Sequence, residues 1–448
     1  MDAHLGADLA ALPDLLADTA AAAARVLDGL ADRPVVRDHQ VEAMPLPRAG
    51  VGMAAALGEF QRRWEPGFSA SAGPRYLGFV TGGATPAALA GDWLTSTHDQ
   101  NVVSGDSSAV LLERETVRWI GRLLGLGPDH DGAFVTGATM SNLVGLSVGR
   151  EWIGAQRGVS VSRSGLAALG EVPVLSGTPH SSVYKALSIT GMGRDCLRLV
   201  PTLPGREAVD VGALAMALES LDGPAIVVAN AGTVNTTDFD DLVAIAALRE
   251  RFPFWLHVDA AFGGFAALSP DHAHLVAGLA EADSVCVDLH KWLNVPYDSA
   301  VQFTRRRDLQ VEVFQNWAPY LGDPGAEPYP MHLVPENSRR LRALPAWFTL
   351  VAYGEEGHRD IVARSIACAS RLGELVARIP GVRLLAPVRL NVVCFEVPGD
   401  PHAVLGDEVF LTPTVYDGRP ALRAAFSNWR TTEADVDRVA AAIGRAYE

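Results

Sequence analysis

Lysine is almost absent from this sequence, because arginine supplies nearly all of the basic side chains. The 448-residue chain has 37 lysine and arginine residues, and only Lys185 and Lys291 are lysine. Arginine stays protonated and is a poor nucleophile, so a retained lysine marks a candidate for amine chemistry. Lys291 follows the apolar run 284–290, where we expect burial to lower its pKa and free the amine for imine formation with an aldehyde. The alternative is a surface lysine at a strand end, and we prefer that interpretation for Lys185.

An acidic residue ends another apolar run. Asp259 lies in the segment WLHVDAAFGG, residues 255–264. A carboxylate at the end of a buried strand is costly unless it has a partner, and a pyridinium nitrogen is such a partner. By keeping that nitrogen protonated, the carboxylate would strengthen the ring as an electron sink. The alternative is an aspartate that caps a turn, since Gly263 and Gly264 follow closely.

Two further segments could hold the rest of a flat, phosphorylated cofactor. The stretch TGATMSN, residues 136–142, lies between an apolar run and a helix, and its backbone N–H groups suit a phosphate. His180, in PHSSVYKAL, opens a helix after a strand, and its imidazole could stack on a flat ring. Such turns are also common helix entries, and Ser181 or Ser182 could serve as an ordinary helix cap.

The elements that must position these residues alternate between strands and helices. Apolar runs occur at 132–137, 172–177, 196–200, 225–232, 255–261, 284–290 and 299–304, with helical stretches at 142–157, 181–191, 212–221 and 241–251. This order predicts an α/β fold with a mostly parallel sheet covered on both faces. Such sheets bind ligands at the carboxyl ends of their strands, where the residues above lie.

Three parts are expected along the chain. Residues 1–72 read as an N-terminal helical arm that is too small for its own core, so it should pack on the body or on a second subunit. Residues 73–345 form the large domain, and 346–448 form a smaller α+β domain. The Pro/Gly-rich stretch 318–337 reads as a mobile loop.

Composition excludes several classes of function. The chain has 52 acidic residues and a formal charge of −15, which argues against a nucleic-acid or anionic-membrane surface. No run of about 18 apolar residues is present, so no membrane span is expected. The N-terminus carries acids where a signal peptide would carry bases. The four cysteines are scattered, so we expect neither a disulfide framework nor a metal site, and a cytoplasmic location.

Taken together, the motifs resemble a known family. The HKW, HVDAA and HSS segments are similar to those of the group II pyridoxal-phosphate-dependent decarboxylases, which act on aromatic amino acids, glutamate or cysteine sulfinate. DWLTST (92–97) and LLERET (111–116) resemble the glutamate and cysteine sulfinate branch. The resemblance implies the aspartate-aminotransferase fold (fold type I), with a seven-stranded sheet and a small C-terminal domain. It also implies pyridoxal 5'-phosphate as cofactor, an L-amino acid as substrate, and a homodimer with a shared active site.

The resemblance also assigns roles to individual residues. Lys291 would form the imine, Asp259 would pair with the ring nitrogen, and His180 would stack on the ring. Tyr329, in the 318–337 loop, would protonate the carbanion after CO₂ leaves, and Tyr320 is the weaker candidate for this role. The remaining assignments are the phosphate contacts Ala138, Thr139 and His290, the cofactor-side Thr233, and the substrate contacts Arg423 and Asn101. Arg423 and the small polar stretch 101–108 favour a compact substrate, and bracing of the small domain is the alternative role for Arg423.

One position departs from the family pattern. Many relatives have Asn-Pro-His-Lys, whereas this chain has Asp288-Leu289-His290-Lys291. We leave Asp288 out of the cofactor set, because an ionised carboxylate would repel the phosphate.

Decarboxylation to an amine is the favoured activity, and other outcomes stay open. Decarboxylation coupled to oxidative deamination would give an aldehyde, and transamination would use the same scaffold. A non-catalytic paralogue is disfavoured by the intact Lys291, Asp259 and His180. A nicotinamide dehydrogenase is disfavoured because no Gly-x-Gly-x-x-Gly turn follows the first strand.

Overall fold

A seven-stranded sheet forms the centre of the molecule. The computed structural model describes residues 1–103, 107–316 and 324–447. The strand order is β1-β7-β6-β5-β4-β2-β3, and only β7 pairs with its neighbours in the antiparallel sense. This confirms the predicted mostly parallel sheet. The strand bounds are β1 Asp131–Val135, β2 Val174–Ser176, β3 Leu197–Leu199, β4 Ala225–Asn230, β5 Phe254–Asp259, β6 Ser284–Asp288 and β7 Ala300–Thr304.

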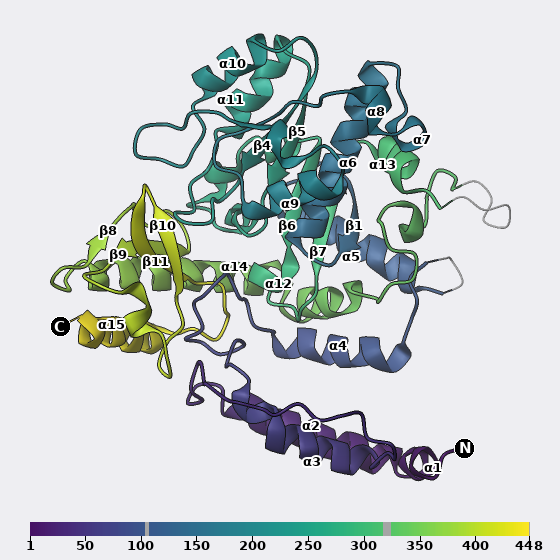
Figure 1. Ribbon diagram of the computed structural model, residues 1–448, viewed down its shortest axis with the longest axis vertical. Coiled ribbons are helices and arrows are strands. Elements are labelled where there is room, and N and C mark those ends of the chain that lie inside the picture. The colour runs from purple at the N-terminus through teal and green to yellow at the C-terminus, as the bar shows by residue number, and fades with distance from the viewer. Residues whose placement is uncertain (104–106, 317–323, 448) are drawn as a thin grey trace.

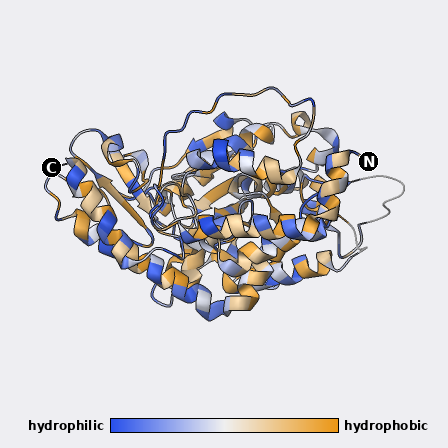
Figure 2. Cartoon of the chain, turned by 90° about the horizontal axis from the view of Figure 1, so that it is seen from below, coloured by the Kyte–Doolittle hydropathy of each residue, from blue (hydrophilic) through white to orange (hydrophobic). Residues whose placement is uncertain are grey.

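Helices cover both faces of this sheet, so its central strands are buried on both sides (Figure 1). One face packs against α6, α9 and α13, and the other against α5, α10, α11 and α14. Their bounds are α5 Ala109–Leu123, α6 Ala138–Gln156, α9 Ser181–Ile189, α10 Val211–Glu219, α11 Leu242–Ala247, α13 Arg307–Phe314 and α14 Ala343–Val376. The strands are largely hydrophobic, whereas the helices alternate hydrophobic and hydrophilic residues (Figure 2). The short helices α7 Val161–Ser164 and α8 Leu166–Leu169 follow α6, and α12 Leu289–Trp292 follows β6.

Helix α14 passes from the large body to a second, antiparallel sheet. It is kinked at Gly354, whose φ of 61° lies in the left-handed region. Its later residues pack in the core of the small sheet, which has the order β10-β11-β9-β8 and is also covered by α15 Glu433–Tyr447. The strands are β8 Arg383–Leu384, β9 Val392–Glu396, β10 Thr412–Tyr416 and β11 Arg419–Ala425.

The N-terminal arm lies along one side of the body, next to α4 Pro86–His98 (Figure 1). It consists of α1 Ala3–Ala10, α2 Leu12–Asp28 and α3 Met53–Arg63, and Pro13 begins α2 rather than interrupting a longer helix. Ala22 is the only residue of these three helices that is fully buried. Among the described residues, no helix is long and apolar enough to cross a membrane.

Residues 77–82, between the arm and α4, contact both the small sheet and the α12 segment. Leu77 N–H donates to the Phe410 carbonyl, and Ala425 N–H donates to the Leu77 carbonyl. A few residues later, the chain packs directly against the α12 segment. A Cβ built on Gly82 would lie 1.7 Å from the Lys291 carbonyl oxygen, so only glycine fits there. The domain boundaries at 72 and 345 stay predictions, since Leu77 packs with the small-domain core.

Gly82→Ala tests this close packing. The added methyl group must displace the Lys291 backbone, so we expect a loss of about 1–3 kcal/mol or more in the free energy of unfolding. Chemical denaturation would measure it. Gly127→Ala is the matched control, because a Cβ at Gly127 meets nothing within 4 Å. Equal stability of the two variants would show that the backbone accommodates the methyl group freely.

Candidate active site

A cavity of about 240 Å³ opens at the carboxyl ends of the central strands. Five residues singled out from the sequence lie on its wall: His180, Thr233, Asp259, Lys291 and Arg423. They come from different parts of the chain, since His180 follows β2, Asp259 ends β5, and Arg423 lies on β11 of the small sheet. Parallel strands place their carboxyl ends at one edge, so the sheet topology brings the first residues together.

A chain of hydrogen bonds runs behind Asp259. Asn142 Nδ2 donates to Asp259 Oδ2 at 2.9 Å, and Asn142 Oδ1 is 2.9 Å from His257 Nε2. His257 Nδ1 is 2.7 Å from Ser284 Oγ, which also accepts from Trp255 Nε1 at 3.0 Å. The Asn142 amide oxygen can only accept, so His257 Nε2 donates to it, and in the neutral ring Nδ1 accepts the Ser284 hydroxyl proton.

The direction of this chain determines what Asp259 can bind. Burial lowers the pKa of His257 to about 4, although Asp259 acts to raise it, so the ring is neutral near neutral pH. Asp259 therefore receives hydrogen bonds from neutral donors, Asn142 and the Ala261 N–H, rather than from a cation. A buried carboxylate without a cationic partner suits a protonated ring nitrogen.

Lys291 lies opposite a second carboxylate. Its Nζ is 2.9 Å from Asp288 Oδ2 and 5.6 Å from the centre of the Phe262 ring. Burial acts to lower the pKa of Lys291, but the charge and hydrogen bond of Asp288, together with the charge of Asp259, raise that pKa. The expectation that burial frees the neutral amine is therefore wrong for this arrangement. The amine is held as an ammonium ion until its proton is removed.

The first turn of α6 forms the proposed phosphate end of the site. The helix begins at Ala138 and Thr139, its N-cap Gly137 provides no side-chain cap, and no acidic residue lies in the first turn. A Cβ on Gly137 would approach His290 Cε1 to 3.4 Å. His290 Nδ1 accepts from the Ser299 N–H at 3.2 Å, so the neutral ring carries its proton on Nε2. Uncapped N–H groups beside an imidazole N–H fit a phosphate.

His180 is both a helix cap and a wall of the cavity. It is the N-cap residue of α9, and its Nδ1 accepts from the Ser182 N–H at 3.3 Å and lies 2.8 Å from Ser182 Oγ. Ser182 Oγ also accepts from Asn142 Nδ2 at 3.0 Å. Burial lowers the pKa of His180, with Asp259 acting in the opposite direction. A neutral, fixed imidazole therefore faces the cavity, as stacking on a flat ring requires.

Thr233 and Arg423 also line the cavity. Thr233 Oγ1 donates to the buried Glu207 carboxylate at 2.5 Å. Arg423 donates to the carbonyl oxygens of Val234 at 2.6 Å and Phe79 at 3.3 Å, while its buried Nε has no partner among the described residues. Burial lowers the pKa of Arg423 to about 10. Its guanidinium makes no ion pair within the described part of the chain, which leaves it available to a bound carboxylate.

Two predicted residues lie away from this cavity. Asn101 is exposed, donates to Ser338 Oγ at 3.3 Å and accepts from the Arg339 N–H at 3.0 Å. Tyr329 precedes the 3₁₀ turn Pro330–His332, is 38% exposed and does not line the cavity. Tyr320 and part of the 101–108 stretch lie outside the described residues. The roles of Asn101 and Tyr329 stay predictions.

Several residues of the site were not predicted from the sequence. Asn142 and His257 orient Asp259, and Phe79, Phe262 and Tyr297 line the cavity. His257 lies on the same strand as Asp259, two residues before it. This spacing places both side chains on one face of the strand and could have indicated that His257 belongs to the site. Phe79 has a φ of 60°, a strained conformation that sequence gives no means to foresee.

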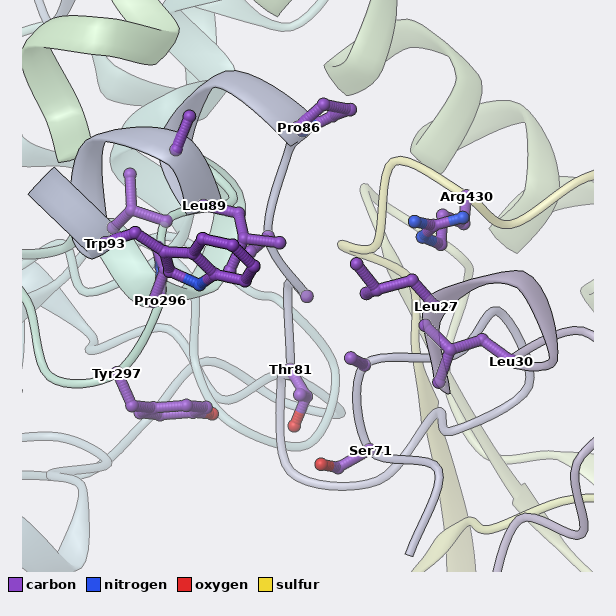
Figure 3. A pocket seen from close by; sticks show the side chains of 15 residues that line it. Leu27, Leu30, Ser71, Thr81, Pro86, Leu89, Trp93, Pro296, Tyr297 and Arg430 are labelled. Carbon is purple, nitrogen blue, oxygen red and sulfur yellow. The ribbon is translucent and has the colours of Figure 1, made fainter. Parts of the chain in front are cut away.

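A second cavity adjoins the first. It has a volume of about 450 Å³, and Tyr297 lines both cavities. In Figure 3, Leu27 at the end of α2 and Leu30 just after it face Leu89 and Trp93 of α4 across the space. The arm and the body are therefore separated by a largely apolar cavity next to the site.

Comparison with known proteins identifies the family. Residues 46–398 match the family model described as the pyridoxal-dependent decarboxylase conserved domain. The chain belongs to this family. It is 30% identical to the aromatic-L-amino-acid decarboxylase of Cavia porcellus over 77% of this chain and 75% of that protein. It is 28% identical to the L-2,4-diaminobutyrate decarboxylase of Rhizobium meliloti (strain 1021) over 96% and 89% of the two chains.

The fold agrees with this membership. The crystal structure of Oryza sativa TDC with PLP and tryptamine superposes with a TM-score of 0.89, at 21% identity, covering 98% of this chain and 97% of the other. The predicted family and type I fold are thus confirmed, as is pyridoxal 5'-phosphate as the cofactor. The protein is a pyridoxal-phosphate-dependent amino acid decarboxylase, a lyase.

Asp259→Ala separates cofactor attachment from turnover. We expect borohydride reduction and mass spectrometry still to find the cofactor on Lys291, because the carboxylate that pairs with this amine among the described residues is that of Asp288 and not that of Asp259. Turnover should fall by about 10²-fold or more, since the electrostatic partner of the ring nitrogen is lost. Asp298→Asn, on an exposed loop, is the control. Activity within a few-fold of the wild type would show that Asp259 has only a structural role.

Proposed function

We propose that the protein decarboxylates a compact L-amino acid to its amine and CO₂, with Arg423 binding a carboxylate of the substrate. The observation that carries this proposal is a buried guanidinium on the cavity wall with no ion-pair partner among the described residues. A planar fork of N–H donors fits a carboxylate in two parallel hydrogen bonds. The small cavity volume leaves little room for a large aromatic substrate beside the cofactor.

Each residue then has a defined task. The cofactor supplies an aldehyde for covalent attachment and a protonated ring that accepts the electron pair left by CO₂. Lys291 provides the amine for attachment, Asp259 keeps the proton on the ring nitrogen, and His180 supports the ring from one side. The phosphate would be held by the backbone N–H groups of Ala138 and Thr139 together with His290 Nε2. Thr233, fixed by Glu207, would also contact the cofactor.

A homodimer would complete the site. The arm exposes Leu5, Leu9, Leu12 and Leu16, and α4 exposes Trp93. Such an apolar surface on a protein of this size favours a protein partner, and a second copy is the simplest one. Tyr329 and Asn101 lie outside the cavity of their own chain, which is what a site shared between two subunits would require.

Arg423→Gln tests the substrate class. Loss of the guanidinium should raise KM for the preferred substrate on the order of 10²-fold, with a smaller effect on kcat. A panel of aspartate, glutamate, cysteine sulfinate and tryptophan, with product detection by mass, identifies that substrate. Arg419→Gln is the control, because Arg419 lies on the same strand but is exposed. Preference for tryptophan, or an unchanged KM with reduced thermal stability, would contradict this role.

Tyr329→Phe tests the reaction outcome and the dimer together. Without the phenol proton, amine formation should slow by about 10²-fold, and aldehyde and peroxide should rise. In mixed dimers of Lys291→Ala and Tyr329→Phe chains, the remaining Lys291 belongs to the chain that lacks the phenol. If Tyr329 acts across the interface, these dimers make amine at the wild-type rate per site. If they make aldehyde, Tyr329 acts in its own subunit, and unchanged amine formation in the single variant would exclude it as the acid.

A further inference from the structure

Asp288 is the most enclosed charged group beside the cofactor lysine. It ends β6, is 2% exposed, and uses Oδ2 for both polar contacts: Lys291 Nζ at 2.9 Å and His290 Nε2 at 3.6 Å. Its Oδ1 is buried and has no hydrogen-bond partner among the described residues. A Cβ built on Gly137 would lie 3.8 Å from this Oδ1. The unpaired oxygen therefore faces the N-terminus of α6, where the phosphate is expected.

Two requirements conflict at this carboxylate. In the cofactor-free protein, a negative Asp288 is compensated by the Lys291 ammonium and by the positive end of α6. When the cofactor is attached, Lys291 must give up its ammonium form, and the phosphate must take the same helix N-terminus. A carboxylate that stayed ionised would then lose its cation and face a second anion, which is unfavourable in a buried site.

We propose that Asp288 accepts the proton that Lys291 must lose during cofactor attachment, and that it stays protonated in the loaded enzyme as a hydrogen-bond donor toward the phosphate. In the transfer, an Nζ–H bond breaks and an Oδ2–H bond forms, so a charged pair becomes a neutral amine and a neutral carboxyl. Rotation of the carboxyl about its Cβ–Cγ bond then brings the protonated oxygen to the position of Oδ1, which faces α6. The step needs no other reactant. It assigns a role to the aspartate that stands where many relatives have asparagine, since a protonated carboxyl and a carboxamide can both donate.

The surrounding groups do not offer another acceptor at this distance. His290 carries its proton on the nitrogen that faces Asp288, because Nδ1 is occupied by the Ser299 N–H. Asp259 accepts from Asn142 and the Ala261 N–H, faces the cavity and makes no ion pair with Lys291 among the described residues. The titratable groups around Asp288 are Lys291 and His290 of α12, Cys286 of β6, Asp259 of β5 and His180 at the start of α9.

Difference infrared spectroscopy tests this proposal without measuring activity. Addition of pyridoxal phosphate to the cofactor-free full-length protein should produce the C=O stretch of a protonated carboxyl, which shifts in D₂O. The band should be lost in Asp288→Asn and kept in Asp298→Asn, which removes a neighbouring exposed carboxylate. Absence of the band in the wild type, or its persistence in Asp288→Asn, would overturn the proposal.

A second measurement uses the wild-type protein alone, in case Asp288→Asn folds poorly. Pyridoxal, which lacks the phosphate, can still attach to Lys291 but brings no anion to α6. We expect the protonated-carboxyl band with both compounds, because Lys291 loses its proton in each, and we expect its frequency to be lower with pyridoxal phosphate, where the carboxyl donates to an anion. Each attachment is checked by borohydride reduction onto Lys291. An identical band position with both compounds would refute the role of Asp288 as a donor to the phosphate.

Discussion

Two buried carboxylates on adjacent parallel strands impose the constraint on which this site depends. Asp259 ends β5 and Asp288 ends β6, and both are almost completely enclosed. Burying an ionised carboxylate is costly unless hydrogen bonds or a cation compensate it. The protein satisfies Asp259 with neutral donors and satisfies Asp288 with Lys291. This difference leaves one carboxylate free to hold a cationic ring and ties the other to the attaching amine.

The neutral donors of Asp259 depend on packing far from the cavity. Asn142 keeps its orientation because His257 donates to its oxygen, and His257 keeps its tautomer because Ser284 and Trp255 fix the other ring nitrogen. A Cβ on Gly145 would lie 2.6 Å from the His257 ring, so α6 can approach the sheet only where it has no side chain. The electrostatics of the ring-binding end thus follow from close packing between α6 and β5.

The part of the cavity wall formed by Arg423 depends on the small domain. Arg423 lies on β11, yet its hydrogen bonds go to Val234 and Phe79 of the large body. Thr412 Oγ1 accepts from the Phe79 N–H, which holds this strained residue against β10. The cavity wall is therefore complete only when the small sheet packs against the large body. A substrate bound to Arg423 would contact both domains.

Strand-end chemistry was predictable from the sequence because it depends on local order along the chain. The apolar runs located all seven strands of the large sheet, and the polar residues that follow them lie at one edge, as parallel topology requires. Phe79, Tyr297 and Asn142 were missed because they reach the site through long-range packing. The ionisation of Lys291 was misjudged because burial was considered without Asp288, and a charge 2.9 Å away outweighs the loss of solvent.

Coverage of the cavity decides what happens after CO₂ leaves. Phe79 and Tyr297 remain more than half exposed on its wall, although both are large and apolar in character. Lys291 retains 19% exposure of its side chain, so a single chain leaves a path for solvent to the reacting amine. A carbanion equivalent needs one directed proton and protection from oxygen, and a site open on this side provides neither. The exposed aromatic rim and the apolar cavity beside Tyr297 thus indicate a surface that must be covered before the site can give amine cleanly.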